Sequence, residues 1–216
     1  MHNITNLNIM FISLNFFNID EIPDRKNIDF KLQVNKQDEQ KVEGVLSQFH
    51  LNNDLPLIIF HPGSGGSAVD LPLSKMKELI DQTAKNLQVN IILTGTADEK
   101  RLCEELSGNS KVFNLAGLLN LGELVALINK ADLMVSNSTG PIHIAAAFKK
   151  FVIGFYPKIK VCSPERWGPY SEKSFIFQPE INCSDCTREQ CERLNCMGSI
   201  NVNKVFKKIE SVISKE

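Results

Sequence analysis

The sequence lacks a surplus of charge of either sign. Its 24 lysines and arginines balance 25 aspartates and glutamates, which gives a formal net charge of −1 at pH 7. A nucleic-acid-binding protein needs basic residues to neutralise the phosphate backbone, and no such excess is present. The composition therefore argues against a nucleic-acid partner.

Long apolar runs are also absent. No stretch approaches the roughly 18 apolar residues that a membrane span requires. The opening residues 1–20 have neither a basic start nor an unbroken apolar core, so they do not resemble a secretory signal. We therefore expect a cytoplasmic protein, either free or attached to the inner face of the cytoplasmic membrane.

Short apolar runs alternate with amphipathic stretches from residue 57 onward. The apolar runs predict strands, and the helically spaced stretches predict helices. The strands are expected at residues 57–60, 90–95, 112–117, 132–137 and 151–156, and the helices at 73–87, 98–106, 121–131, 141–148 and 201–213. Such an alternation indicates a parallel sheet covered on both faces. We predict an α/β fold with a doubly wound, mostly parallel, Rossmann-like sheet.

The two ends of the chain have weaker patterns. Residues 1–50 contain one polar helix in their second half and no convincing core of their own. The strand and helix pattern also loosens after residue 156, before the last helix. The expected core therefore lies within the alternating region.

The loop after the first strand, "HPGSGGSAVDLP", is rich in glycine. Ligands of open parallel sheets bind beyond the carboxyl ends of the strands, and Gly63, Gly65 and Gly66 would let backbone N–H groups approach an anion. The loop lacks the Gly-Lys-Ser/Thr of a Walker motif. It matches G-x-G-x-x-A, but no acidic residue follows at the end of a second strand, as a dinucleotide site requires. An anion-facing loop and a merely tolerant turn both remain open.

The stretch "VSNSTGPIHIAAA" contains a second candidate. We predict that Ser138 or Thr139 caps a helix with Pro141 in its first turn, where the missing N–H costs nothing. The exposed N–H groups of such a helix attract anions, and His143 lies in the same turn. Alternatively, the segment is only a good helix start and His143 is a satisfied buried histidine.

These segments together resemble a known family. "HPGSGG", "ILTGTADEKRLCEEL", "NLAGLLNLGELVALINKADLMVSNSTGPIHIAAA" and "PERWGPY" follow the order found in ADP-heptose lipopolysaccharide heptosyltransferases, which are inverting glycosyltransferases of the GT-B type. The resemblance covers residues 57–213. It implies that residues 51–216 form the C-terminal, nucleotide-sugar-binding domain with a cysteine-rich end. Residues 1–50 would be the interdomain connection or a remnant of the N-terminal domain.

The resemblance also implies roles for particular residues and partners. The donor, an ADP-sugar, would bind without a further cofactor, and a glycolipid would be the acceptor. Thr139 and His143 would stabilise the departing diphosphate, whereas the catalytic base would belong to an N-terminal half. The chain would then be a truncated or split glycosyltransferase, or it would work beside a separately encoded N-terminal half. The expected donor-binding residues are Ser64, Asn137, Ser138, Thr139, Gly140 and His143 near the diphosphate, Glu99 at the ribose and Leu118 beside the base.

Two departures from the family pattern bear on function. The family usually has an acidic residue in place of Ser138, and Lys/Arg-x-Trp-Pro in place of residues 69–72, "VDLP". Loss of one charge-assisted contact to phosphate costs on the order of 1.5–3 kcal/mol, or one to two decades of affinity. A non-catalytic remnant or interaction module that retains the fold is therefore the main alternative, and an NAD oxidoreductase based on "GSGGSA" ranks last.

Four of the six cysteines, Cys183, Cys186, Cys191 and Cys196, lie within fourteen residues with the spacing C-x2-C-x4-C-x4-C. This spacing is compact enough for a zinc or iron–sulfur site. Zinc ribbons, however, usually draw their ligands from two separated pairs, so free thiols or a local disulfide are favoured over a metal. Trp167 is expected to be a packing anchor.

Overall fold

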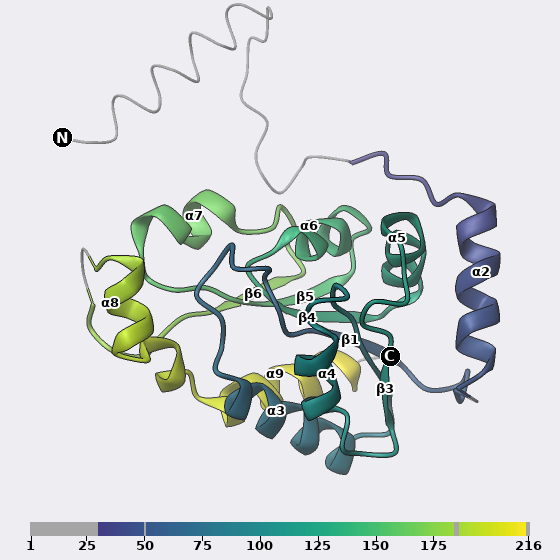
Figure 1. The fold of residues 1–216 in the computed structure, drawn as a ribbon, viewed down its shortest axis with the longest axis horizontal. Coiled ribbons are helices and arrows are strands. Elements are labelled where there is room, and N and C mark those ends of the chain that lie inside the picture. Colours follow the sequence, from purple (N-terminus) through teal and green to yellow (C-terminus); the bar gives the residue numbers. More distant parts are fainter. Residues whose placement is uncertain (1–29, 50, 184–185, 215–216) are drawn as a thin grey trace, which may run out of the picture.

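The computed structural model describes residues 30–49, 51–183 and 186–214, and it contains a six-stranded, all-parallel sheet. The strand order is β3-β2-β1-β4-β5-β6, and Figure 1 shows the sheet at the centre of the molecule. The predicted doubly wound, Rossmann-like fold is confirmed. The strands are β1 (Leu57–His61), β2 (Asn90–Leu93), β3 (Val112–Asn114), β4 (Leu133–Asn137), β5 (Phe151–Phe155) and β6 (Ser174–Phe177).

Helices cover both faces of this sheet (Figure 1). One face carries α3, α4 and α9, and the other carries α5 and α6, with α2 packed against α5. The bounds are α2 (Lys36–Ser47), α3 (Leu73–Asn86), α4 (Lys100–Leu106), α5 (Leu121–Lys130), α6 (Gly140–Ala147), α7 (Pro164–Trp167), α8 (Arg188–Arg193) and α9 (Val202–Ile213), with short 3-10 helices η2 (Lys160–Cys162) and η3 (Cys196–Ser199).

The central strands β1 and β4 are apolar except at their carboxyl ends, because both of their faces are covered. In β1, alternate side chains enter different cores: Ile58 and Phe60 pack under α3 and α9, whereas Ile59 packs under α5 and α6. All three are fully buried. A strand with two buried faces reads as a continuous apolar run, which is why the sequence predicted these strands well.

Strand β6 was not predicted. It pairs in parallel with β5, with Ile153 opposite Phe175 and Phe155 opposite Phe177. All of its residues are only partly buried, since β6 lies at the edge of the sheet. A short edge strand has neither the continuous nor the alternating pattern on which strand prediction depends.

Helix α2 confirms the polar helix expected in the second half of residues 26–50. Its Asn35 side chain accepts a hydrogen bond from the Gln37 N–H at 2.9 Å, which caps the helix. Val42 is 1% exposed and belongs to the same core as α5 and α6. The domain boundary at residue 50 stays a prediction, and residues 1–29 lie outside the described part of the chain.

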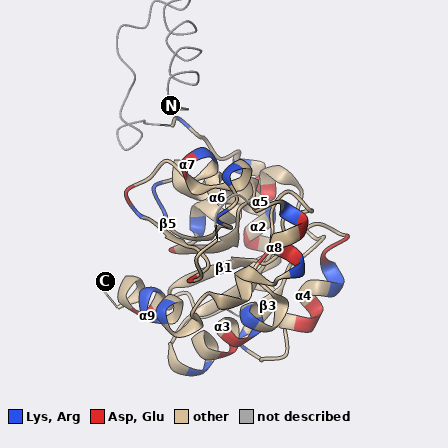
Figure 2. Cartoon of the chain, turned by 90° about the vertical axis from the view of Figure 1, so that its left-hand side faces the viewer, with Lys and Arg blue, Asp and Glu red and all other residues tan. Residues whose placement is uncertain are grey.

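Both signs of charge occur along α3, α4 and α8 (Figure 2). Several of these charges pair within one helix, such as Lys77 with Asp81 at 3.2 Å. Among the described helices, none is long and apolar enough to cross a membrane.

Candidate functional site

The candidate site lies at the carboxyl ends of β1, β2 and β4. The chain leaves β1 toward β2 on one side and β4 toward β5 on the other, so the strand order reverses between β1 and β4. Loops diverge at such a switch point and leave a crevice, which is where open α/β sheets bind ligands. Both segments identified from the sequence, residues 61–72 and 135–147, meet there because β1 and β4 are hydrogen-bonded neighbours.

Helix α6 begins at this edge. Thr139 occupies the N-cap position with extended backbone, and Pro141 lies in the first turn, as predicted. The predicted side-chain cap is wrong, because Ser138 precedes the cap position and the Thr139 hydroxyl makes no capping hydrogen bond. The first N–H groups of α6 therefore lack the side-chain acceptor that usually satisfies one of them.

A cavity of about 380 Å³ opens over this helix start. Ser138, Thr139, Gly140 and His143 line it together with Ser67, Val161, Cys162 and Trp167. Partial burial lowers the pKa of His143 from its ordinary value, so burial favours the neutral form of the imidazole. The structure thus brings together four of the predicted phosphate-binding residues.

A second cavity, of about 300 Å³, lies beside the first and shares Thr139 with it. Its polar wall includes Ser64 and Glu99, and its apolar wall includes Leu119, Leu121 and Leu124. The two cavities form adjacent compartments along one edge of the sheet. One compartment faces a helix N-terminus, and the other combines a carboxylate with aliphatic side chains.

Glu99 is held from two loops. Its Oε1 accepts a hydrogen bond from the Gly65 N–H at 3.0 Å, and its Oε2 accepts from the N–H and the hydroxyl of Thr96 at 2.8 and 3.1 Å. Burial alone would raise the pKa of Glu99, but these hydrogen bonds and nearby His61 outweigh it and lower the pKa. Glu99 is therefore an ionised, oriented carboxylate on the cavity wall.

The glycine-rich loop is shaped to receive this carboxylate. Gly63 packs so closely on Glu99 that a Cβ atom there would overlap the carboxylate. Gly65 and Gly66 have φ values of 55° and 79°, which favour glycine. The Gly65 N–H thus binds the Glu99 carboxylate, and binding of a ligand anion by this loop stays a prediction.

Ser64 and Asn137 face the protein more than the cavity. The Ser64 hydroxyl accepts a hydrogen bond from the Ala68 N–H at 3.3 Å. Asn137 is fully buried, accepts from the Leu71 N–H at 2.9 Å and donates to the Pro62 carbonyl. Asn137 therefore ties both ends of the glycine-rich loop to the end of β4, and a direct contact of either residue with a ligand stays a prediction.

Leu118 lies apart from the two cavities. It is 56% exposed and follows Gly117, whose φ is 75°. The next residues along the chain, Leu119 and Leu121, line the second cavity instead. The predicted segment reaches the site, although the residue predicted beside the base does not line it.

Two site residues were missed by the sequence reasoning. His61, the last residue of β1, lines the second cavity, and its Nδ1 lies 2.9 Å from the Thr94 hydroxyl. Burial lowers the pKa of His61, although Glu99 opposes this shift. Tyr156 is fully buried and donates a hydrogen bond at 2.9 Å to the carbonyl of Trp167, which lines the first cavity. His61 ends β1, and Tyr156 directly follows β5. This position at the end of a strand is the feature of the sequence that could have identified both residues.

The loop between β1 and α3 contains a carboxylate where the resembling family has a basic motif. Asp70 Oδ1 is buried and has no hydrogen-bond partner. Burial raises the pKa of Asp70 to about 6, against the opposing effect of a hydrogen bond with Ser64. The basic residue missing at Val69 is therefore not replaced within this loop.

The cysteine-rich segment contains free thiols. Cys191 and Cys196 are buried in the core under α3 and α9, whereas Cys183 and Cys186 are partly exposed. Within residues 30–49, 51–183 and 186–214, no group of three or more histidine, cysteine or acidic side chains is arranged to hold a metal ion. Trp167 is 50% exposed and donates to the Val161 carbonyl at 2.8 Å, so it is a wall of the first cavity as well as a packing residue.

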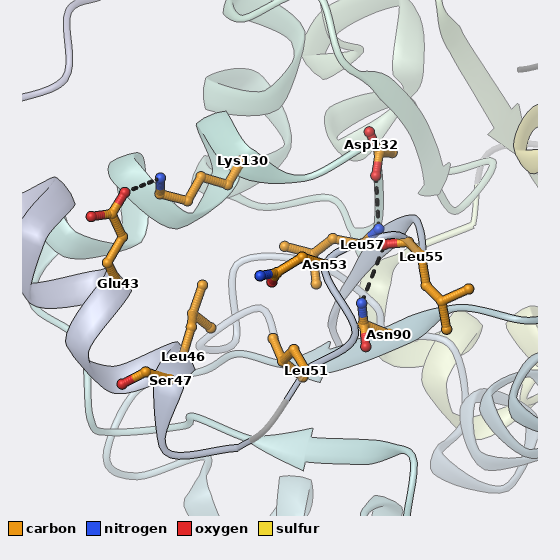
Figure 3. A pocket seen from close by; sticks show the side chains of 10 residues that line it. All are labelled: Glu43, Leu46, Ser47, Leu51, Asn53, Leu55, Leu57, Asn90, Lys130 and Asp132. Carbon is orange, nitrogen blue, oxygen red and sulfur yellow. Dashed lines mark hydrogen bonds and ion pairs between the residues drawn. The ribbon is translucent and has the colours of Figure 1, made fainter.

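A larger cavity, of about 740 Å³, lies at the opposite edge of the sheet (Figure 3). Its charged side chains are already satisfied: Lys130 by Glu43 at 2.8 Å, and Asp132 by the Leu57 N–H at 2.7 Å. This edge holds the amino ends of the strands and the carboxyl end of α5, where the helix dipole repels anions. The cavity at the carboxyl edge is therefore the better ligand site despite its smaller volume.

Comparison with known proteins identifies the family of this chain. The model of glycosyltransferase family 9 (heptosyltransferase) matches residues 11–197. Lipooligosaccharide heptosyltransferase 2 of Campylobacter jejuni is 23% identical over 171 residues, which are 76% of this chain and 53% of the relative. The chain spans 37% to 53% of the length of four curated relatives that it matches.

Two solved structures share the fold. The structure of E. coli ADP-heptose lps heptosyltransferase II superposes with a TM-score of 0.66 and 23% identity, covering 85% of this chain and 53% of the other. E. coli heptosyltransferase WaaC with ADP superposes with a TM-score of 0.59 and 20% identity, covering 79% and 48%. On the family match over most of its length, this chain belongs to glycosyltransferase family 9, the heptosyltransferase family.

Proposed function

We propose that this chain is the donor-binding half of a glycosyltransferase, and that it binds a nucleotide-diphosphate sugar of the ADP-heptose type. The observation that carries the proposal is the pair of cavities that share Thr139 at the carboxyl edge of the sheet. One fits a diphosphate and the other fits a nucleoside. A solved relative is described as a complex with ADP, which supports this choice of nucleotide.

The diphosphate would lie against the start of α6. Its negative charge is attracted by the N–H groups of the first helical turn and by hydrogen bonds from Thr139 and His143. When an acceptor hydroxyl attacks the anomeric carbon, further negative charge develops on the departing diphosphate. Donors fixed in advance then stabilise the transition state more than the ground state.

The nucleoside would occupy the second cavity. Glu99 is ionised and fixed in orientation, so it can accept hydrogen bonds from ribose hydroxyl groups. The aliphatic wall formed by Leu119, Leu121 and Leu124 offers an apolar surface for a base. Thr139 lines both cavities, so the two cavities meet at this residue. This arrangement matches a ligand in which the ribose is linked directly to the diphosphate.

The remaining parts of the reaction would come from an N-terminal half. We propose that such a half supplies the catalytic carboxylate and binds a glycolipid acceptor, with inversion at the anomeric carbon. Transfer would take place in the cytoplasm at the inner face of the membrane, where such an acceptor is accessible. No further cofactor is needed for this displacement, and no nucleic acid takes part.

Binding of ADP tests the proposal directly. Trp167, the single tryptophan, lines the first cavity, so its fluorescence should change on binding, and calorimetry should give the Kd. Thr139→Val and His143→Gln should each weaken ADP binding by about tenfold, as expected for loss of a hydrogen bond to a charged group. Asn53→Ala, at the opposite edge of the sheet, is the control and should leave the Kd unchanged. No binding of ADP, UDP or GDP at millimolar concentration would sink the proposal.

A non-catalytic module that retains the fold is the second candidate. It is favoured by the Asp70 carboxylate and by Val69, which stands where the family usually has a basic residue. It is also favoured by the hydrogen bond from the Gly65 N–H to the Glu99 carboxylate, which already satisfies this N–H. Under this alternative, Thr139→Val and His143→Gln would alter stability alone.

A further inference from the structure

A guanidinium group from the cysteine-rich segment reaches the glycine-rich loop. Arg188, the first residue of α8, donates from Nη1 to the Gly66 carbonyl at 2.7 Å and from Nη2 to the Ala68 carbonyl at 3.0 Å. These contacts join residues 122 and 120 positions apart in the sequence. One planar group thus bridges two carbonyls of a loop that contains no lysine or arginine of its own.

The two carbonyls flank a residue of the first cavity. Ser67 lies between Gly66 and Ala68 and lines the cavity beside Thr139 and His143. Its hydroxyl donates to the Ser64 carbonyl at 2.8 Å, and the Ser138 carbonyl lies 3.4 Å from the same hydroxyl. Arg188 therefore fixes the Gly66–Ser67 and Ala68–Val69 peptide units, between which Ser67 and Ala68 lie. Movement of these units would change the distance between the loop and the start of α6.

Helix α8 holds Arg188 in a defined place. Thr187 and Gln190 form a reciprocal capping box at its start, with hydrogen bonds of 3.2 and 2.9 Å. Cys191 is 1% exposed and is packed in the core. Glu192 accepts from Arg188 Nε at 2.8 Å and so sets the plane of the guanidinium. The position of Arg188 thus depends on buried packing and on local hydrogen bonds together.

The charge of Arg188 acts on the same part of the site. Arg188 lies within electrostatic range of Asp70 and of Cys162, which lines the first cavity. Arg188 counters the negative charge of Asp70, which would otherwise repel a diphosphate. Arg188 does not line the first cavity, but its charge lies beside the loop that forms one wall, and the N-terminus of α6 lies at another wall.

We propose that Arg188 is a positioning residue for the diphosphate of the donor, supplied from the cysteine-rich segment in place of the missing basic residue of the loop. This inference rests on the proposed function. It assigns a role to the segment around Cys191 and Cys196: these buried residues anchor α8, and α8 presents Arg188 to the loop. The two parallel hydrogen bonds require a guanidinium, since a lysine ammonium lacks the planar fork.

The test compares ADP with adenosine, which lacks phosphates, in the full chain. Arg188→Gln should weaken ADP binding by about tenfold or more and adenosine binding by less than about threefold, because Ser67, between the two clamped residues, lines the first cavity and not the second. Arg188→Lys should restore only part of the loss, since it keeps the charge without the fork. Arg193→Gln removes the same charge from the exposed end of the same helix and should leave both affinities unchanged.

Each other result has a distinct meaning. Equal losses for ADP and adenosine, or full affinity for ADP in Arg188→Gln, would overturn the role of Arg188 while leaving the proposed function intact. Absence of ADP binding in the unmodified chain would remove the proposed function and this inference together. If Arg188→Gln does not fold, Arg188→Lys decides alone: affinity for ADP equal to that of the unmodified chain would refute the requirement for a guanidinium.

Discussion

At the scale of single residues, the buried carboxyl group of Asp70 makes the stability of the chain depend on pH. Its Oδ1 is buried without a hydrogen-bond partner, and burial raises its pKa from 3.8 to about 6. Because the folded chain binds this proton more tightly than the unfolded chain, the stabilisation by Asp70 is complete below pH 3.8. It is lost as the pH rises through about 6.

Asp70→Asn should therefore stabilise the chain at neutral and alkaline pH. A shift of about two pKa units corresponds to about 3 kcal/mol at most, so we expect the free energy of unfolding at pH 8 to rise by about 1–3 kcal/mol. At pH 4 the gain should nearly vanish. Urea denaturation at the two pH values measures the difference, with exposed Asp54→Asn as control. A gain of equal size at both pH values would show that packing, not ionisation, is the cause.

Gly63→Ala tests the contact between the glycine-rich loop and Glu99. The new Cβ would overlap the Glu99 carboxylate, so either the loop or the side chain must move. We expect a loss of about 1–3 kcal/mol in the free energy of unfolding, as for other overpacked sites. Gly44→Ala, in open space within α2, should instead stabilise the chain by up to about 1 kcal/mol. Denaturant titration of both variants would contradict the close contact if Gly63→Ala were neutral.

At the scale of elements, the docking of α2 shows how a polar helix joins a shared core. Lys130 of α5 forms ion pairs with Glu39 at 3.3 Å and Glu43 at 2.8 Å, and Val42 enters the apolar layer beneath them. Exposed ion pairs stabilise by less than about 1 kcal/mol each. The buried Val42 side chain is therefore the stronger part of the contact.

Val42→Ala should lower the free energy of unfolding by about 1–3 kcal/mol, because it removes two buried methyl groups and leaves a cavity. Gln40→Ala, on the exposed side of the same helix, should change it by less than about 0.5 kcal/mol. Thermal unfolding followed by circular dichroism compares the two. If they behaved alike, α2 would contribute little to the fold.

At the scale of the whole molecule, one sheet joins two apolar cores. Leu79 lies in the core under α3 and α9, and Leu127 lies in the core on the other face. The strands between them contribute side chains to both. We therefore expect the two cores to unfold together.

Leu79→Ala and Leu127→Ala should each reduce the free energy of unfolding by about 2–5 kcal/mol, since both side chains are fully buried. Each variant should show one transition with the same midpoint by circular dichroism and by Trp167 fluorescence. A variant in which the two probes separate would indicate that the faces unfold independently.

The sequence by itself determined five of the six described strands, most of the described helices and the start of α6. These features depend on local patterns: apolar runs that are buried on both faces, helical spacing, and a proline in the first turn of a helix. The resemblance added the family, which the comparisons confirm. The local pattern and the resemblance therefore predicted Thr139, Gly140 and His143 as one group of site residues.

Only the tertiary structure decided which loops meet and what each side chain does there. The sequence could not show that Glu99 binds the Gly65 N–H, that Asn137 fastens the same loop from β4, or that Arg188 reaches it from α8. It also did not reveal β6, which lies half-buried at the sheet edge. Such contacts join residues tens to more than a hundred positions apart, and their partners are chosen by the packing of helices on the sheet. No local period in the sequence records that choice, because hydrophobic patterning specifies which face is buried but not which side chain lies opposite.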